Sequence, residues 1–272
     1  MIASLPPLRD VIARHKLLAR KSLGQHFLLD LNLTRRIVES AGDLKDCAVF
    51  EIGPGPGGLT RALLESEAKK IVAIEKDSRC VESLADLKKI AGKRLNVVEG
   101  DALKLDLTEL APKPRAIVAN LPYNIATPLL LGWLRQTGAY RSLTLMFQAE
   151  VADRLTAKPG TKAYGRLSVI TQHCCDVKRV LNVPARAFTP PPKVDSAVVR
   201  LTPRADRPKD VSFESLEAVT AAAFGQRRKM LRSSLRSLGG EVLLEKAGIN
   251  PQRRAEELTI EEFETLARRL RT

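Results

Sequence analysis

Short apolar runs alternate with helical stretches through the first two thirds of the chain, and this alternation restricts the fold more than any other feature. The strand-like runs are Cys47–Ile52, Lys70–Glu75, Leu95–Glu99, Arg115–Ala119 and Leu143–Gln148. The helical stretches between them are Leu59–Glu67, Arg79–Ala91 and Pro128–Thr137, the last with Thr127 as its expected cap. Strands that alternate with helices predict a parallel sheet covered by helices on both faces. We therefore expect a doubly wound, Rossmann-like α/β fold.

The last part of the chain has a different pattern. Two further β-like runs, Leu167–Cys174 and Ser196–Leu201, are expected to complete the sheet, one of them reversed. After a linker that contains Pro203 and Pro208, helices are predicted over 212–238, 240–247, 251–257 and 260–270. Asn250-Pro251 and a Thr259–Glu262 capping box mark two of the expected starts. We predict a basic N-terminal arm (1–22), an α/β domain (23–204) and a small all-α domain (205–272).

The charge balance indicates a polyanionic partner. Lysine and arginine number 45 against 31 acidic residues, a formal net charge of +14. The expected N-terminal arm contributes Arg9, Arg14, Lys16, Arg20 and Lys21. We therefore favour a nucleic-acid partner.

Cysteine usage and hydropathy restrict the cellular setting. The 4 cysteines lack metal-ligand spacing and only 3 histidines are present, so we expect no metal. Buried, reduced thiols are the simplest interpretation and favour the cytoplasm. No apolar run approaches the roughly 18 residues that a membrane span needs, so we expect no membrane association.

Glycines follow the first strand and precede a helix. Gly53, Gly55 and Gly58 have the spacing of a dinucleotide-binding fingerprint, and glycine allows the backbone to approach a ligand closely. Glu75, which ends the next strand, could bind two ribose hydroxyls. This pattern alone leaves two cofactors open, a nicotinamide dinucleotide and S-adenosylmethionine.

Acidic and amide side chains end successive strands. Glu51, Glu75, Asp101 and Asn120 all fall at the carboxyl edge of the predicted sheet, where open α/β sheets bind ligands. A carboxylate at Glu51 would repel a pyrophosphate. Asp101 could accept a hydrogen bond from an adenine amino group. The set favours a zwitterionic nucleoside ligand without phosphates.

The tetrapeptide Asn120-Leu121-Pro122-Tyr123 ends the fourth strand. It brings a side-chain carbonyl, a backbone carbonyl and an aromatic face to one edge. These groups suit the exocyclic amine of a flipped-out base. An ordinary turn with a surface tyrosine is the other interpretation of this motif alone.

Five spaced motifs, taken together, carry a resemblance. They are Gly24-Gln-His-Phe-Leu28, Glu51-Ile-Gly-Pro-Gly55, Asp101-Ala102, Asn120-Leu-Pro-Tyr-Asn-Ile-Ala-Thr-Pro128 and Phe188-Thr-Pro-Pro-Pro-Lys-Val-Asp-Ser196. With them the chain resembles the ribosomal RNA adenine N6-dimethyltransferase family, and its bacterial small-subunit (16S) branch in particular. The match runs from about Ala19 to the C-terminus, because Phe224–Leu231 resembles the family's C-terminal helix.

The resemblance implies a class I S-adenosylmethionine methyltransferase fold, S-adenosylmethionine as cofactor, and N6,N6-dimethylation of two adjacent adenines in 16S rRNA. The implied cofactor contacts are His26, Leu28, Gly53, Glu75, Asp101 and Asn120, to which the residue pattern adds Glu51 and Gly55. One departure is His26, where the family commonly has asparagine.

The expected catalytic set is Asn120, Pro122, Tyr123 and Phe188, with the two rings stacking on the target base. For RNA we expect Arg227, Arg228, Lys229, Arg232 and Arg236, with 228, 232 and 236 on one helix face.

The resemblance implies a monomer that acts on 16S rRNA within the 30S subunit or its precursor. Three alternatives stay open: a 23S rRNA adenine methyltransferase of the resistance type, a non-catalytic RNA-binding assembly factor, and a nicotinamide dehydrogenase.

Overall fold

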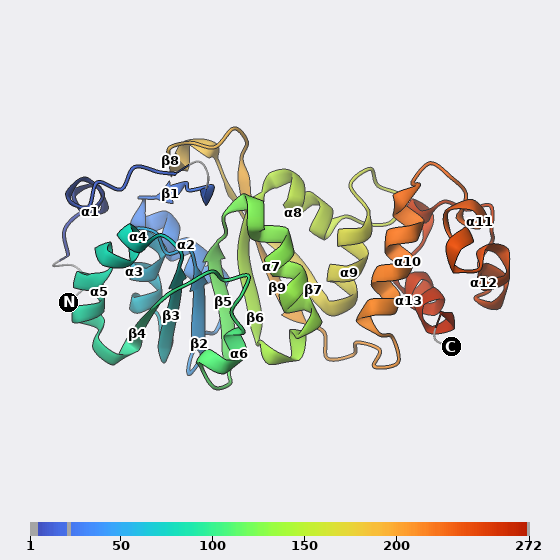
Figure 1. The fold of residues 1–272 in the computed structure, drawn as a ribbon, viewed down its shortest axis with the longest axis horizontal. Helices are drawn as coiled ribbons and strands as arrows, with labels where there is room; N and C mark the ends of the chain where they lie inside the picture. The colour runs from blue at the N-terminus through green and yellow to red at the C-terminus, as the bar shows by residue number, and fades with distance from the viewer. Residues whose placement is uncertain (1–4, 21–22, 271–272) are drawn as a thin grey trace. The chain divides into compact units, whose positions relative to one another are not determined.

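A seven-stranded sheet lies at the centre of the first of two compact units in the computed structural model, which describes residues 5–20 and 23–270 (Figure 1). The strand order within these residues is β4-β3-β2-β5-β6-β9-β7. The strands are β2 (Ala48–Ile52), β3 (Lys70–Glu75), β4 (Leu95–Glu99), β5 (Arg115–Asn120), β6 (Ser142–Gln148), β7 (Cys175–Val183) and β9 (Ser196–Pro203). Strands β2 to β6 pair in parallel, and β9 pairs antiparallel with β6. The predicted parallel sheet with a reversed strand is confirmed.

The direction of chain progression reverses between β2 and β5. Strands β3 and β4 extend the sheet to one side of β2, whereas β5 and β6 extend it to the other. The carboxyl ends of strands at such a point form a crevice in which doubly wound proteins bind ligands. Every residue of β2 is buried, as expected for a central strand with both faces covered.

Helices connect these strands. In the first unit they are α1 (Leu8–Arg14), α2 (Leu31–Ser40), α3 (Gly58–Glu65), α4 (Ser78–Ser83), α5 (Ala85–Ala91), α6 (Leu107–Leu110), α7 (Tyr123–Arg135) and the start of α8 (Ala149–Thr156). Short 3₁₀ helices are η3 (Gly92–Arg94), η4 (Thr137–Ala139) and η5 (Ala185–Ala187). Part of the expected basic arm forms α1, whereas Lys21 lies outside the described residues.

Helix α7 begins earlier than the sequence predicted. Thr127 is not its cap, because the helix already starts at Tyr123 and Pro128 lies inside it. Proline removes one helical hydrogen bond. The helix continues because Ala126, Leu129 and Leu130 are buried, and packing of an apolar face outweighs a local stop signal.

A separate two-stranded ribbon is formed by a segment before β2 and a segment between β7 and β9. Strand β1 (Phe27–Leu28) pairs antiparallel with β8 (Phe188–Thr189), with Leu28 opposite Phe188. This pairing joins residues far apart in the sequence. It brings the Gly24–Leu28 motif next to the proline-rich Phe188–Ser196 motif.

The second unit comprises residues 153–177 and 204–272. Its helices are α9 (Arg166–Cys174), α10 (Phe213–Gly225), α11 (Leu231–Ser234), η6 (Arg236–Leu238), α12 (Gly240–Lys246), η7 (Ala255–Glu257) and α13 (Ile260–Arg269). Phe224 stacks on Phe263 with ring centroids 5.5 Å apart and meets the buried Tyr164 edge-on at 6.0 Å. The expected Thr259–Glu262 capping box is present at the start of α13.

A buried polar chain also lies in the second unit. His173 Nδ1 donates to Glu264 Oε1 at 2.7 Å, and Arg207 Nε donates to His173 Nε2 at 3.1 Å. These bonds define a neutral imidazole with its proton on Nδ1. Burial lowers the pKa of His173, which favours the same neutral form.

Three predictions for this region are wrong. Residues 167–174 form helix α9 rather than a strand, and Ser168 ties its start by accepting from Gly165 N at 3.0 Å. The helix expected over 212–238 is interrupted after Gly225, because Met230 bridges to Arg254 and Leu231 N bonds to Arg253 O. The third is the helix expected over 251–257, which is a turn followed by η7. In the last two segments, backbone bonds to residues distant in the sequence determine the structure, and a local pattern does not show them.

None of the helices among the described residues combines the length and the apolar character needed to cross a membrane.

Candidate functional site

A cavity lies at the carboxyl ends of β2, β3, β4 and β5, at the point where the strand order reverses. Gly53, Glu75, Asp101 and Asn120 each line it from one of these strand ends. Residues 23–27, the segment that leads into β1, form a further wall. The side chains that the sequence placed at one sheet edge therefore meet in one cavity.

The glycine loop after β2 needs its glycines. Gly53, Gly55 and Gly57 have φ values of 69°, 55° and 90°, in the left-handed region that favours glycine. A Cβ on Gly58 would lie 2.4 Å from the backbone oxygen of Leu28. Because Gly58 has no side chain, the start of α3 can lie directly against the backbone of β1. The backbone of Gly53 and Gly55 lines the cavity.

Glu75 is held by three backbone N–H groups. Its Oε1 accepts from Lys76 N and Asp77 N, both at 2.8 Å, and its Oε2 accepts from Gly55 N at 3.1 Å. Burial raises the pKa of this carboxyl, and the three hydrogen bonds act in the opposite direction. A carboxylate offers about four acceptor positions, so one remains for a ligand hydroxyl.

Asp101 is paired with a lysine at the same edge. Lys76 Nζ lies 2.9 Å from Asp101 Oδ2, and Leu103 N donates to Asp101 Oδ1 at 3.1 Å. The hydrogen bond from Lys76 is the main reason that the pKa of Asp101 lies below its ordinary value. Asp101 is therefore an ionised hydrogen-bond acceptor. A ligand can displace the exposed Lys76 side chain from Asp101 or bind the carboxylate beside it.

Glu51 lies deeper than the other acids. It is 1% exposed, does not line the cavity, and its Oε2 has no hydrogen-bond partner among the described residues. Burial raises its pKa to about 8, with a contribution from the nearby Glu75. A buried carboxyl without a cationic partner is held most stably in its neutral form.

Asn120 has a defined orientation. Its Nδ2 donates to the backbone oxygen of His26 at 3.2 Å. The amide oxygen Oδ1 is thereby left as the acceptor for another group. The carbonyl of Pro122 already accepts from Ile125 N at 3.1 Å and has a second lone pair.

Tyr123 and His26 form an aromatic pair beside Asn120. Their ring centroids are 5.7 Å apart with an interplanar angle of 28°. The Tyr123 hydroxyl bonds to Ser196 Oγ at 2.7 Å, and His26 Nδ1 donates to the backbone oxygen of Pro190 at 2.7 Å. Both rings are thus held at their edges by the segment around β8 and β9.

Some predicted site residues do not reach the cavity. Leu28 and Phe188 are 5% and 3% exposed and face each other across the β1–β8 pair, behind the lining residues. Phe188 meets the edge of the His26 ring at 6.4 Å. Of the predicted cofactor and catalytic residues, those that line the cavity are His26, Gly53, Gly55, Glu75, Asp101, Asn120, Pro122 and Tyr123.

The predicted RNA-binding residues lie in the second unit and do not share one helix. Arg228 and Lys229 are exposed in the turn after α10, Arg232 lies in α11 and Arg236 in η6. The expected i, i+4 face is therefore wrong. Arg227 donates to Glu256 Oε2 at 2.8 Å and to Thr161 O at 3.3 Å, so its charge is partly neutralised.

Sequence reasoning did not select Gln25 and Lys76, which also line the cavity. The only available signal was adjacency, since Gln25 precedes His26 and Lys76 follows Glu75. Their partners, Asp77 and Asp101, lie at sequence separations of 52 and 25 residues.

The polar side chains that line the cavity fit a cationic nucleoside better than a dinucleotide. Among the described lining residues, Lys76 is the one lysine and no arginine is present. The Lys76 ammonium forms an ion pair with Asp101, so none of the described lining residues offers an unpaired cation to a pyrophosphate. Glu75 and Asp101 provide acceptors for hydroxyl and amino groups, and their charge favours a positively charged ligand.

A doubly wound sheet with this cavity at its switch point places the chain among the Rossmann-like α/β proteins that bind a nucleotide or nucleoside cofactor, and the lining favours the phosphate-free cofactor of a methyltransferase. Residues 16–272 match the pattern of the family described as ribosomal RNA adenine dimethylase. The chain belongs to that family.

Individual relatives agree with this placement. The chain is 60% identical over 270 residues to the ribosomal RNA small subunit methyltransferase A of Paramagnetospirillum magneticum, covering 99% of this chain and 96% of that protein. A dimethyladenosine transferase from Plasmodium falciparum has a similar structure, with a TM-score of 0.77 and 29% identity over 89% of this chain and 96% of that one. The 23S rRNA methyltransferase ErmE is also similar, with a TM-score of 0.69 and 30% identity over 90% of this chain and 100% of that one.

Proposed function

We propose that this protein transfers methyl groups from S-adenosylmethionine to N6 of two adjacent adenines in the 3′-terminal hairpin of 16S rRNA, producing N6,N6-dimethyladenines. Family membership and the small-subunit name of the 60% identical relative support this activity. The single structural observation that carries it is the Asn120 amide, oriented by His26 O so that its oxygen is left as an acceptor at the cavity.

Residues at the ends of three strands fit the cofactor S-adenosylmethionine. When bound, S-adenosylmethionine supplies an electrophilic methyl group on a positively charged sulfur. Glu75 has one acceptor position left for a ribose hydroxyl, and Asp101 is an acceptor for an adenine amino group if Lys76 shares or yields its place. Gly53 and Gly55 leave room for close backbone approach.

Asn120 and Pro122 orient the nucleophile. The N6 lone pair of adenine is delocalised into the ring and reacts poorly. Accepting both N6–H groups, one on Asn120 Oδ1 and one on the Pro122 carbonyl, favours a pyramidal nitrogen whose lone pair is available. Positioning and matched electrostatics supply the rate enhancement. No strong base is needed, because the methylated nitrogen is strongly acidic while cationic.

Tyr123 supplies the stacking face for the target base, a contact worth about 1–3 kcal/mol. Its ring lines the cavity and is fixed through Ser196. Phe188 is buried against the His26 edge. Phe188 therefore supports the pocket wall, and its direct contact with a base requires the β1–β8 pair to shift.

Exposed cations of the second unit, with the basic N-terminal segment, bind the RNA phosphates. Arg228, Lys229, Arg232 and Arg236 are the candidates with exposed side chains, and Arg232 lies 3.7 Å from Glu241. The substrate is 16S rRNA within the 30S subunit or its precursor in the cytoplasm, and the protein acts as a monomer. The net charge of +14 supports a polyanionic substrate.

Transfer of tritiated methyl groups tests this function. Small subunits from a strain lacking the two dimethyladenines should become labelled when the wild-type protein is supplied with tritiated S-adenosylmethionine, and Asn120→Ala should label them about 10²–10³-fold more slowly. A primer-extension map of blocked positions on both rRNAs separates this activity from methylation of 23S rRNA. Label confined to 23S rRNA, or absent from both, would overturn the proposal.

A further inference from the structure

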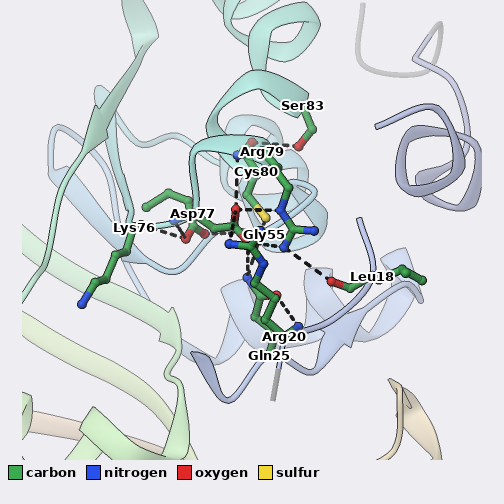
Figure 2. A network of polar contacts seen from close by, with 10 residues as sticks. Leu18, Arg20, Gln25, Gly55, Lys76, Asp77, Arg79, Cys80 and Ser83 are labelled. Carbon is green, nitrogen blue, oxygen red and sulfur yellow. Dashed lines mark hydrogen bonds and ion pairs between the residues drawn. The ribbon is translucent and has the colours of Figure 1, made fainter. Parts of the chain in front are cut away.

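A buried carboxylate next to the cavity collects contacts from two parts of the chain. The Asp77 side chain has no exposed surface. Arg79 donates to it through Nε at 3.0 Å and Nη2 at 2.6 Å, and Gln25 Nε2 donates to it at 3.1 Å (Figure 2). Such charge-assisted bonds in a forked geometry are among the stronger polar contacts in proteins.

The contacts of Asp77 extend into the N-terminal segment at three residues. Gln25 Oε1 accepts from Arg20 N at 2.9 Å, and Arg20 Nη1 lies 3.9 Å from Asp77 Oδ1. Arg79 Nη2 reaches the backbone oxygen of Leu18 at 3.5 Å. The segment that leads into the cavity wall is therefore attached to the turn after β3.

The same turn holds the acid proposed to bind ribose. Asp77 N donates to Glu75 Oε1, and Glu75 Oε2 accepts from Gly55 N. One continuous network thus runs from Gln25 through Asp77 and Glu75 to the glycine loop, joining three walls of the cavity (Figure 2).

We propose that Asp77 is a positioning residue for the cofactor: through Gln25 it holds residues 23–26 against the cavity and sets cofactor affinity. This inference rests on the proposed function. Asp77 itself does not line the cavity, whereas Gln25 does, so the effect of Asp77 passes through its partners. The forked pair with Arg79, with Gln25 adding to it, keeps the pKa of Asp77 near 2, so the carboxylate is charged at every working pH.

Three variants test the inference. Asp77→Asn weakens the Arg79 fork and the Gln25 bond. Gln25→Ala removes the bond to Asp77 and the bond from Arg20 N, and leaves the Asp77–Arg79 pair intact, so it reports on positioning even if Asp77→Asn is poorly folded. Glu65→Gln is the matched control, because Glu65 is also forked by one arginine, Arg35, at 2.7 and 3.1 Å, and does not line the cavity.

The readout is the Kd for S-adenosylhomocysteine measured by calorimetry. We expect the loss of these hydrogen bonds to raise Kd about tenfold in Asp77→Asn and about fivefold in Gln25→Ala, with no change in Glu65→Gln. The Kd of the double variant, Asp77→Asn with Gln25→Ala, should be close to that of Asp77→Asn alone, because both substitutions disrupt the same Gln25–Asp77 hydrogen bond. Trypsin cleavage after Arg20 should be faster in both variants.

The possible outcomes separate the two proposals. Wild-type Kd values in both Gln25→Ala and Asp77→Asn would overturn the positioning role while leaving the proposed function intact. A wild-type protein that does not bind S-adenosylhomocysteine would overturn the proposed function. Fully additive effects in the double variant would show that the two residues act separately.

Discussion

The side-chain amide of Asn120 donates to the backbone carbonyl of His26 at 3.2 Å. The bond distinguishes the two ends of the amide, because only the nitrogen can donate. It joins the end of β5 to the residue before β1. Since the contact uses the backbone of His26, an asparagine at this position can make the same bond.

Removal of the Asn120 side chain should slow methyl transfer strongly. Asn120→Ala deletes the oxygen proposed to accept one N6–H, and loss of one preorganised polar contact of this kind reduces kcat by about 10²–10³-fold. Asn120→Asp keeps an acceptor but loses the donor to His26 O, so it should be strongly impaired as well. Initial rates of tritium transfer to unmethylated small subunits measure both.

The matching control is His26→Asn, which keeps the backbone oxygen and should retain the Asn120 orientation. RNA affinity should stay close to that of the wild type in both Asn120 variants. Equal losses of RNA binding and of methyl transfer would contradict the proposed role of Asn120.

The turn after α10 gives a second prediction. Arg228→Ala and Lys229→Ala should each reduce the slope of log affinity against log salt by about 0.7–0.9, the value for one phosphate contact. Arg227→Ala should change the slope less, because Arg227 already pairs with Glu256. Fluorescence anisotropy with a hairpin RNA between low and physiological salt measures the slopes. An equal reduction in all three variants would mean that the Arg227–Glu256 pair opens on binding.

Two glycines in helices should respond oppositely to alanine. Gly58→Ala places a Cβ 2.4 Å from Leu28 O, a clash that backbone shifts relieve at a cost of about 1–3 kcal/mol. Gly132→Ala, inside α7, meets nothing within 4 Å and should stabilise by about 0.5–1 kcal/mol through helix propensity. Urea unfolding measures both. Destabilisation by Gly132→Ala would indicate a neighbour that fills that space in solution.

Local pattern was sufficient for the five parallel strands and for the edge at which the cavity lies, but not for β7. Strands β3 and β4 have the bounds expected from their apolar runs, since each is a short apolar segment with a polar residue at its end. The placement of Glu75, Asp101 and Asn120 at one cavity followed from strand order alone, and their roles stay predictions.

Features that depend on distant partners could not be predicted. The run at 167–174 contains β-branched residues typical of a strand, but Val169 and Ile170 are buried in the helical unit. Phe188 is a core residue because it pairs with Leu28, and these two residues lie 160 positions apart in the sequence. The Gln25–Asp77 bond likewise joins residues 52 positions apart, which no local motif encodes.

Glu51 should make stability depend on pH. Its pKa is raised to about 8 in the folded protein, against an ordinary value of 4.5. The unfolded chain ionises first as pH rises, so the folded state loses stability between about pH 4.5 and pH 8 and loses no more above that. Glu51→Gln keeps a neutral side chain at every pH. The free energy of unfolding of Glu51→Gln, relative to that of the wild type, should therefore rise by about 2–3 kcal/mol between pH 5.5 and pH 7.5.

Urea unfolding of both proteins at these two pH values measures the difference without cofactor. Glu65→Gln is a suitable control, because the pKa of Glu65 is lowered mainly by its hydrogen bond with Arg35 and its removal should not reproduce this trend. A constant difference between Glu51→Gln and the wild type across the range would mean that Glu51 is already ionised in the folded protein. A cation or a donor would then have to reach its Oε2, which has no partner among the described residues.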